Sequence, residues 1–178
     1  DLSGVAAPGK PHPKVDERTD EMLFFNYSKK EPYLHYGVVD ANNDVVHYTD
    51  IPLPGPRLPH DMAFTRNYAI FNDFPLFWDP ELLERDLHVA RFHRDMPSRF
   101  AVLPRRGTAA DVRWFEADPT FVLHFTNAYE DGDEIVVDGF FQGDPEPADN
   151  GTGTKWQRTF RFLALDRMQA RLHRWRFN

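Results

Sequence analysis

Residues 33–48 read YLHYGVVDANNDVVHY, and this stretch decides the fold class. An apolar run at residues 33–39 is followed by the turn residues 41–44 (ANND) and by a second apolar run at residues 45–48. Two runs rich in β-branched and aromatic residues, separated by Asn and Asp, are typical of antiparallel strands joined by a tight turn. The stretch therefore predicts a β-hairpin.

Similar short runs recur on both sides of this hairpin. We expect further strands at residues 22–27, 62–65, 68–72, 99–103, 112–116, 121–125, 134–141, 157–165 and 170–177. The proline-rich residues 51–56 predict a connection, because proline cannot donate to a β-ladder, and the polar residues 143–154 predict a loop. Only residues 79–85 are typical of a helix, with Asp79 as N-cap and Pro80 in the first turn. The pattern predicts an all-β fold, as a sandwich, a barrel or a propeller, with one short helical insertion.

Composition narrows the class of protein. The 178 residues are 41% hydrophobic and 28% charged, with a formal net charge of −7, and their number is typical of one domain. The negative charge argues against nucleic acid as a partner, because phosphate binding needs a basic face. The absence of cysteine excludes disulfides and thiolate metal sites, and no apolar run approaches the roughly 18 residues of a membrane span. We expect a cytoplasmic protein without a nucleic-acid partner.

Three of the eight histidines stand out through their surroundings. His12 lies in HPKVD (12–16), His60 in PHDMAFT (59–65) and His124 in FVLHFTNAYE (121–130), each where a predicted loop meets an apolar strand. Convergent imidazoles suit Fe, Zn, Cu or Ni rather than Mg or Ca. The spacings of 48 and 64 residues match no local metal motif. The residues alone leave open whether these three share a metal or are ordinary structural histidines.

The same segments resemble the signature segments of the carotenoid cleavage oxygenase family. Its pattern of His-Pro-Lys-Val-Asp and then Thr-Gly-Glu is similar to residues 12–16 and 19–21, and its Pro-His-Asp-Phe-Ala segment is similar to residues 59–65. A His followed by Asn-Ala-(Trp/Tyr)-Glu is similar to residues 124–130, and weaker agreement at residues 32–38, 98–105 and 114–116 extends the resemblance through nearly the whole chain. The chain departs from the family pattern at Pro11, which replaces an alanine, at Asp20, which replaces a turn glycine, and at Leu123, which replaces a Phe.

The resemblance implies a seven-bladed β-propeller that holds Fe(II) on its axis with four histidines. His12, His60 and His124 match the first three ligand positions. The fourth ligand and the glutamates that orient the ligands are expected outside this chain, and His173, in an ordinary predicted strand, is not assigned to the site. No catalytic residue is expected beyond the metal ligands. Residues 1–178 are thus expected to be a single segment of a propeller domain, incomplete at both ends.

The activity implied by the resemblance is that of a non-haem Fe(II) dioxygenase. It would use O2 to cleave a C=C bond of a carotenoid or apocarotenoid into two carbonyl products, without an organic cofactor. The alternatives are a stilbene-cleaving dioxygenase, a retinoid isomerase of the same fold, and a non-catalytic propeller that acts as a binding module.

A lipophilic polyene or stilbene substrate would need an apolar entrance. Residues 74–78 (FPLFW), with Leu82, Leu83 and Leu87, lie where the family has a helical insertion near the entrance. One hypothesis is that this patch dips into a membrane, giving a membrane-associated protein. The other is that its aromatic residues pack in the core.

Overall fold

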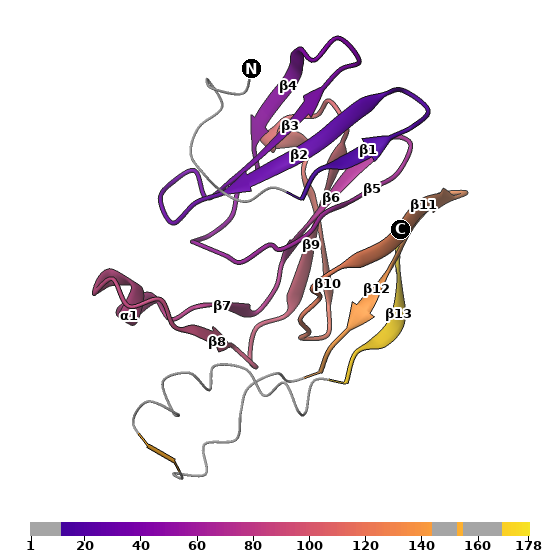
Figure 1. Cartoon of the computed structure of the whole chain (residues 1–178). Coiled ribbons are helices and arrows are strands. Elements are labelled where there is room, and N and C mark those ends of the chain that lie inside the picture. The colour runs from indigo at the N-terminus through magenta and orange to yellow at the C-terminus, as the bar shows by residue number, and fades with distance from the viewer. Residues whose placement is uncertain (1–11, 144–152, 155–168) are drawn as a thin grey trace.

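The computed structural model describes residues 12–143, 153–154 and 169–178 (Figure 1). The described residues are mostly β-strand with little helix, as predicted. The strands are β1 (Lys14–Asp16), β2 (Glu21–Tyr27), β3 (Leu34–Val39), β4 (Val45–Asp50), β5 (Ala63–Phe64), β6 (Tyr68–Asp73), β7 (Leu76–Trp78), β8 (Ala90–Phe92), β9 (Ser98–Pro104), β10 (Arg113–Ala117), β11 (Phe125–Asp131), β12 (Glu134–Phe141) and β13 (Arg171–Phe177). The helix α1 spans Pro80–Glu84, and a 3-10 turn spans Ala109–Asp111.

The strands form three antiparallel sheets that follow one another along the chain. Their strand orders are β1-β2-β3-β4, β10-β9-β6-β5 and β11-β12-β13, and β7 pairs with β8 in a separate ribbon that carries α1. Figure 1 shows the sheets side by side in chain order, from indigo to yellow, with the α1 ribbon projecting from the middle one. Each sheet is thus a largely local unit, and contacts between sheets hold the units together.

The hairpin predicted from residues 33–48 is confirmed as β3 and β4. The carboxylate of Asp40 accepts hydrogen bonds from the backbone N–H groups of Asn42, at 2.9 Å, and Asp44, at 3.0 Å. Asn43 takes a left-handed conformation with φ 66°, which asparagine tolerates better than most residues. The turn chemistry therefore lies in the short polar residues that separate the two apolar runs.

The middle sheet is buried on both faces. Successive residues of β6 and β9 point to opposite faces: Ala69, Phe71, Ala101 and Leu103 pack in a cluster with β2 and β3, whereas Ile70, Phe100 and Val102 pack in a cluster with β12 and β13. Strands buried on both faces are nearly continuously apolar, which explains why both were visible in the sequence. The three sheets therefore stack face to face, with the β5-β6-β9-β10 sheet in the middle.

The structure corrects the strand predicted at residues 121–125. The strand here is β11, which begins at Phe125 and ends at Asp131. Phe121 makes only an isolated bridge to Gln142, and Phe121 and Val122 are buried as core residues. Their apolar character therefore reflects packing rather than membership of a ladder.

Other predictions met different outcomes. The short strands β1, β7 and β8 were not predicted, because three residues are too few to form a recognisable apolar run. The strand predicted at residues 157–165 lies outside the described residues, as does most of the predicted loop at residues 143–154.

The predicted helix is confirmed, and it places the apolar patch of residues 74–78. The carboxylate of Asp79 caps α1 by accepting a hydrogen bond from the N–H of Leu82, at 3.1 Å. Phe74, Leu76 and Phe77 are buried, and the ring of Phe77 stacks on that of His93 with 3.9 Å between centroids. Core packing is thus the role of most of this patch.

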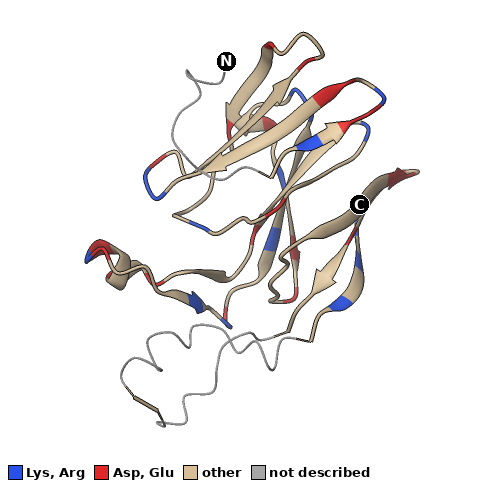
Figure 2. Ribbon diagram, viewed as in Figure 1, with Lys and Arg blue, Asp and Glu red and all other residues tan. Residues whose placement is uncertain are grey.

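What remains exposed is the tip of the ribbon. Trp78, Leu82 and Leu83 are half-buried there, and Leu87 is 46% exposed. Acidic and basic residues are interspersed along the chain, including in and around α1 (Figure 2). In the part of the chain that the structure describes, no helix has the length and hydropathy needed to span a membrane.

Candidate metal centre

The three singled-out histidines precede the first strand of three different sheets. His12 lies two residues before β1, His60 three residues before β5, and His124 immediately before β11. Each of these strands is at the edge of its sheet, and β5 and β11 lie against each other. The stacking of the sheets therefore brings residues that are 48 and 64 positions apart to one place.

The three imidazole rings form a cluster. Their centroids are 4.5 Å apart for His12 and His60, 5.3 Å for His60 and His124, and 6.0 Å for His12 and His124. With a metal–nitrogen bond of about 2.1 Å and about 1.1 Å from nitrogen to ring centre, two rings on one ion have centroids about 4.5 Å apart at a right angle and about 5.2 Å apart at the tetrahedral angle. The observed separations fall in or slightly above this range.

The ring centroids are close, but the side chains do not form a ready-made ligand set. Within residues 12–143, 153–154 and 169–178, no group of three or more His, Cys, Asp or Glu side chains stands ready to hold a metal ion. The structure therefore shows three imidazole rings gathered at one place, with tilted or edge-on ring planes at 46°, 59° and 76° to one another.

The surroundings of His60 favour its neutral form. Burial lowers the pKa of His60, and the neighbouring His12 and His124 lower it further, whereas Asp61 acts in the opposite direction. A metal ligand must be a neutral imidazole. An all-imidazole donor set of this kind fits iron, zinc, copper or nickel.

The backbone beside His124 is irregular. The ladder between β11 and β12 shifts register between Phe125 and Asn127. Such a bulge leaves one residue unpaired and redirects neighbouring side chains, and bulges are common next to functional sites. It follows directly after the histidine that joins the third sheet to the cluster.

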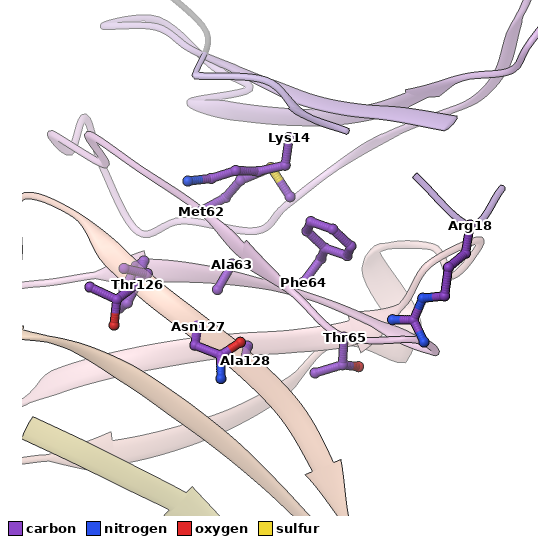
Figure 3. Close-up of a pocket in the computed structure, with 10 residues that line it drawn as sticks. Lys14, Arg18, Met62, Ala63, Phe64, Thr65, Thr126, Asn127 and Ala128 are labelled. Atoms are coloured by element: carbon purple, nitrogen blue, oxygen red, sulfur yellow. The ribbon is translucent and has the colours of Figure 1, made fainter. Parts of the chain in front are cut away.

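A cavity of about 240 Å³ lies next to the histidine segments (Figure 3). It is lined by residues that follow the three histidines in sequence: Lys14, Arg18, Met62, Ala63, Phe64, Thr65, Phe125, Thr126, Asn127 and Ala128. Figure 3 shows Met62 and Phe64 together with the basic side chains of Lys14 and Arg18. The cavity is therefore lined by residues in or next to the edge strands β1, β5 and β11.

Glu130, which belongs to a recognised sequence segment without an assigned role, ties two sheets together. It accepts hydrogen bonds from the hydroxyl of Thr65 at 2.5 Å, and from the backbone and side-chain amides of Asn67 at 2.9 and 2.7 Å. Burial alone would raise the pKa of Glu130, but these hydrogen bonds together leave it below its usual value. Glu130 therefore holds β11 against the turn between β5 and β6.

Of the departures from the family pattern, Asp20 has a local explanation, and Pro11 lies outside the described residues. Asp20 has φ 54° in the turn between β1 and β2, the left-handed region that a glycine would occupy most easily and that aspartate tolerates. Leu123 is 37% exposed beside His124.

His173 lies on β13, at the opposite edge of its sheet from β11, with its ring 4.6 Å from that of Trp175. It is not part of the cluster.

Asp61 was missed by sequence reasoning although it lies inside a recognised segment. Its side chain is 1% exposed and its carboxylate pairs with Lys14 Nζ at 2.8 Å. The available signal was a charged residue inside the otherwise apolar stretch of residues 59–65. Charged side chains are rarely buried unless they are paired, but the partner could not be read from a chain position 47 residues away.

Comparison with known proteins identifies relatives of the chain. The family model described as "Retinal pigment epithelial membrane protein" matches residues 4–178. A carotenoid 9,10(9',10')-cleavage dioxygenase of Crocus sativus is 39% identical over 128 residues, which are 71% of this chain and 23% of that protein. An isoeugenol monooxygenase of Pseudomonas putida is 37% identical over 130 residues, 71% of this chain and 27% of that protein. The chain thus spans about a quarter of the length of these relatives.

A solved structure agrees with the sequence comparison. The lignostilbene dioxygenase of Pseudomonas brassicacearum matches with a TM-score of 0.74 and 30% identity, covering 93% of this chain and 34% of that one. The histidine segments, the fold and the family model therefore lead to one conclusion. The chain belongs to the retinal pigment epithelial membrane protein family, that of the carotenoid cleavage oxygenases.

Proposed function

We propose that the full-length protein containing this chain is a non-haem Fe(II)-dependent dioxygenase. It cleaves a C=C bond of a carotenoid or apocarotenoid into two carbonyl products. The observation that carries the proposal is the convergence of His12, His60 and His124 from three different sheets, with ring centroids 4.5–6.0 Å apart. These are the histidines that the family pattern matches to metal ligands.

The proposed architecture is a seven-bladed propeller of which residues 1–178 form one segment. Support comes from three antiparallel sheets of three or four strands, stacked face to face with their first strands at a shared inner edge. Radial repetition of such sheets is what defines a propeller. In this arrangement the inner edge strands β1, β5 and β11 line the axis.

The residues of the site have simple roles in this proposal. When bound, the ferrous ion supplies the redox chemistry that allows O2 to react with an olefin. His12, His60 and His124 hold it as neutral imidazoles, which the low pKa of His60 favours. Each carbon of the cleaved bond takes one oxygen atom of O2, so the olefin provides all the electrons and no external reductant or organic cofactor is needed. The protein positions the substrate and keeps water away from the site.

Product analysis tests this function. The full-length protein is loaded with Fe(II) without oxygen and then supplied with 18O2 and a panel of a carotenoid, an apocarotenoid, a stilbene and isoeugenol. The panel includes several classes because relatives named for carotenoids and for isoeugenol match at 39% and 37% identity. We expect two carbonyl fragments from a carotenoid or apocarotenoid, each carrying one 18O atom.

Other products would identify the alternatives. Cleavage of the stilbene alone would show the same dioxygenase reaction with a stilbene, rather than a carotenoid, as substrate. An unlabelled, isomerised product would indicate an isomerase, and the absence of any conversion by iron-loaded protein would indicate a binding module.

Peripheral membrane contact and a cytoplasmic location complete the proposal. The contact would involve the tip of the β7–β8 ribbon, where Trp78 and Leu87 remain accessible. Burial of a leucine side chain is worth about 1.5 kcal/mol or more, which corresponds to roughly tenfold in affinity. The Trp78→Ser/Leu87→Ser variant should therefore lose at least about tenfold in liposome binding, measured by cosedimentation. Val46→Ser on β4, an exposed apolar position elsewhere, should bind as the wild type does, and equal binding by all three proteins would contradict the contact.

A further inference from the structure

The carboxylate of Asp61 is the meeting point of the three histidine segments. Its Oδ1 accepts a hydrogen bond from the N–H of Met62 at 2.9 Å, and its Oδ2 accepts one from the N–H of Phe125 at 3.0 Å. Lys14 Nζ lies 2.8 Å from Oδ1 and 3.1 Å from Oδ2. One buried side chain therefore contacts a residue of β1, a residue of β11 and the residue that directly precedes β5.

Each of these partners is one or two residues from a clustered histidine. Lys14 is two residues after His12, Met62 is two residues after His60, and Phe125 directly follows His124. The separations are so short that the position of each partner largely determines the position of the histidine backbone. Asp61 thus links the three segments at residues next to their histidines.

The need for such a group follows from the topology. Phe125 is the first residue of the edge strand β11, and Met62 directly precedes the edge strand β5, so the N–H groups of both residues bond to the Asp61 carboxylate rather than to the carbonyl of a further strand. A buried amide without an acceptor is costly, so these groups are nearly always paired. A carboxylate with two oxygens can accept from both amides and still pair with a cation. A neutral side chain at this position could not replace all three contacts.

Asp61 is itself held in place from the middle sheet. The side-chain amide of Asn72 on β6 donates a hydrogen bond to the backbone carbonyl of Asp61 at 3.1 Å, and both residues are buried. Asp61 is therefore held both at its backbone carbonyl and at the two oxygens of its side chain.

We propose that Asp61 is a positioning residue for the metal centre, holding the segments of His12, His60 and His124 at the spacing that one ion requires. This inference rests on the proposed function, since it assumes that the three histidines bind a metal. The competing explanation is that the carboxylate contributes only to stability. The two differ in what they predict for metal binding by folded protein.

The test is the Asp61→Asn variant of the full-length protein, titrated anaerobically with Co(II) as a spectroscopic probe. Asparagine keeps the size of the side chain but has one carbonyl oxygen and no charge, so it loses the pair with Lys14 and one of the two amide contacts. Residues that orient metal ligands typically contribute 10–100-fold to metal affinity. We expect Co(II) affinity to fall by about 10–100-fold and the ligand-field spectrum to change, at a temperature at which circular dichroism shows the variant folded.

Asp138→Asn is the matched control. Asp138 is also buried, and it pairs with Arg174 through two hydrogen bonds of 2.7 and 2.9 Å on the neighbouring strand β13. Its loss should destabilise the third sheet while leaving Co(II) affinity and the spectrum unchanged. A stability-only role for Asp61 predicts that the two variants behave alike.

Lys14→Met removes one arm of the same network while leaving the carboxylate in place. We expect Lys14→Met to lower the Co(II) affinity. Adding Lys14→Met to Asp61→Asn should lower the affinity by less than Lys14→Met does in the wild type, because the two residues act through one contact. If Asp61→Asn does not fold, the Lys14→Met variant decides the question. A Lys14→Met protein with the Co(II) affinity and spectrum of the wild type would then overturn the proposal. Folded Asp61→Asn that binds Co(II) as the wild type does would overturn it equally.

Failure of the proposed function would look different. In that case the wild-type protein itself would not bind Co(II), or its binding would not change in His60→Ala. Wild-type binding that depends on His60 but not on Asp61 would refute only the positioning role.

Discussion

The His60→Ala substitution is expected to lower the affinity of the full-length protein for Fe(II) by more than about 100-fold, because it removes a ligand and not merely a group that orients one. His60 is the central member of the cluster, with its ring centroid 4.5 Å from that of His12 and 5.3 Å from that of His124. Anaerobic titration against a competing chelator measures the affinity, and the proposed dioxygenase activity should fall with it.

His173→Ala is the control for this prediction. His173 is exposed on β13, and it is outside the cluster. Its replacement should leave iron content and affinity unchanged. Stoichiometric iron in His60→Ala and His124→Ala would instead show that the cluster is not the metal centre.

The second large effect is expected from Phe100→Ala, which should lower the free energy of unfolding by about 3–5 kcal/mol. Phe100 is fully buried on β9. Its ring lies 5.0 Å from Phe74, 5.3 Å from Trp175 and 4.8 Å from Phe177, measured between centroids. The substitution would open a cavity between the middle sheet and the third sheet, which chemical denaturation of the full-length protein can measure.

Leu172→Ala provides the comparison for a large apolar residue that is not in the core. Leu172 lies on β13 and is 69% exposed. Its replacement should change the free energy of unfolding by less than about 0.5 kcal/mol. Equal effects for the two variants would mean that Phe100 does not hold the sheets together.

Local features of the fold were predictable and tertiary ones were not. The β3–β4 hairpin and the α1 cap could be read from the sequence because Asp40 and Asp79 act on amides within four residues of themselves. β11 was placed too early because Phe121 and Val122 are apolar for packing reasons, which a single sequence cannot distinguish from strand formation. Short strands such as β1 give too few residues for any pattern.

The candidate site shows the same division. His12, His60 and His124 were selected by matching segments to a family, since spacings of 48 and 64 residues contain no geometric information. Asp61 escaped because its role depends on Lys14 and Phe125, which reach it only when the sheets pack together. A role that depends on partners so distant in sequence cannot be assigned from sequence alone.

The placement of one histidine before each sheet has a consequence for the order of folding. Most strand pairs within a sheet join consecutive strands, and the longer connections between β6 and β9 and between β12 and β13 add little because loop-closure cost grows slowly with length, so strands can pair within a sheet before the sheets dock. None of these units contains more than one histidine of the cluster. The cluster comes into existence only when the three units dock, at the most non-local step of assembly. Metal binding would then be a late event in folding. A folding intermediate in which every sheet has formed but the sheets have not docked would still lack a metal site.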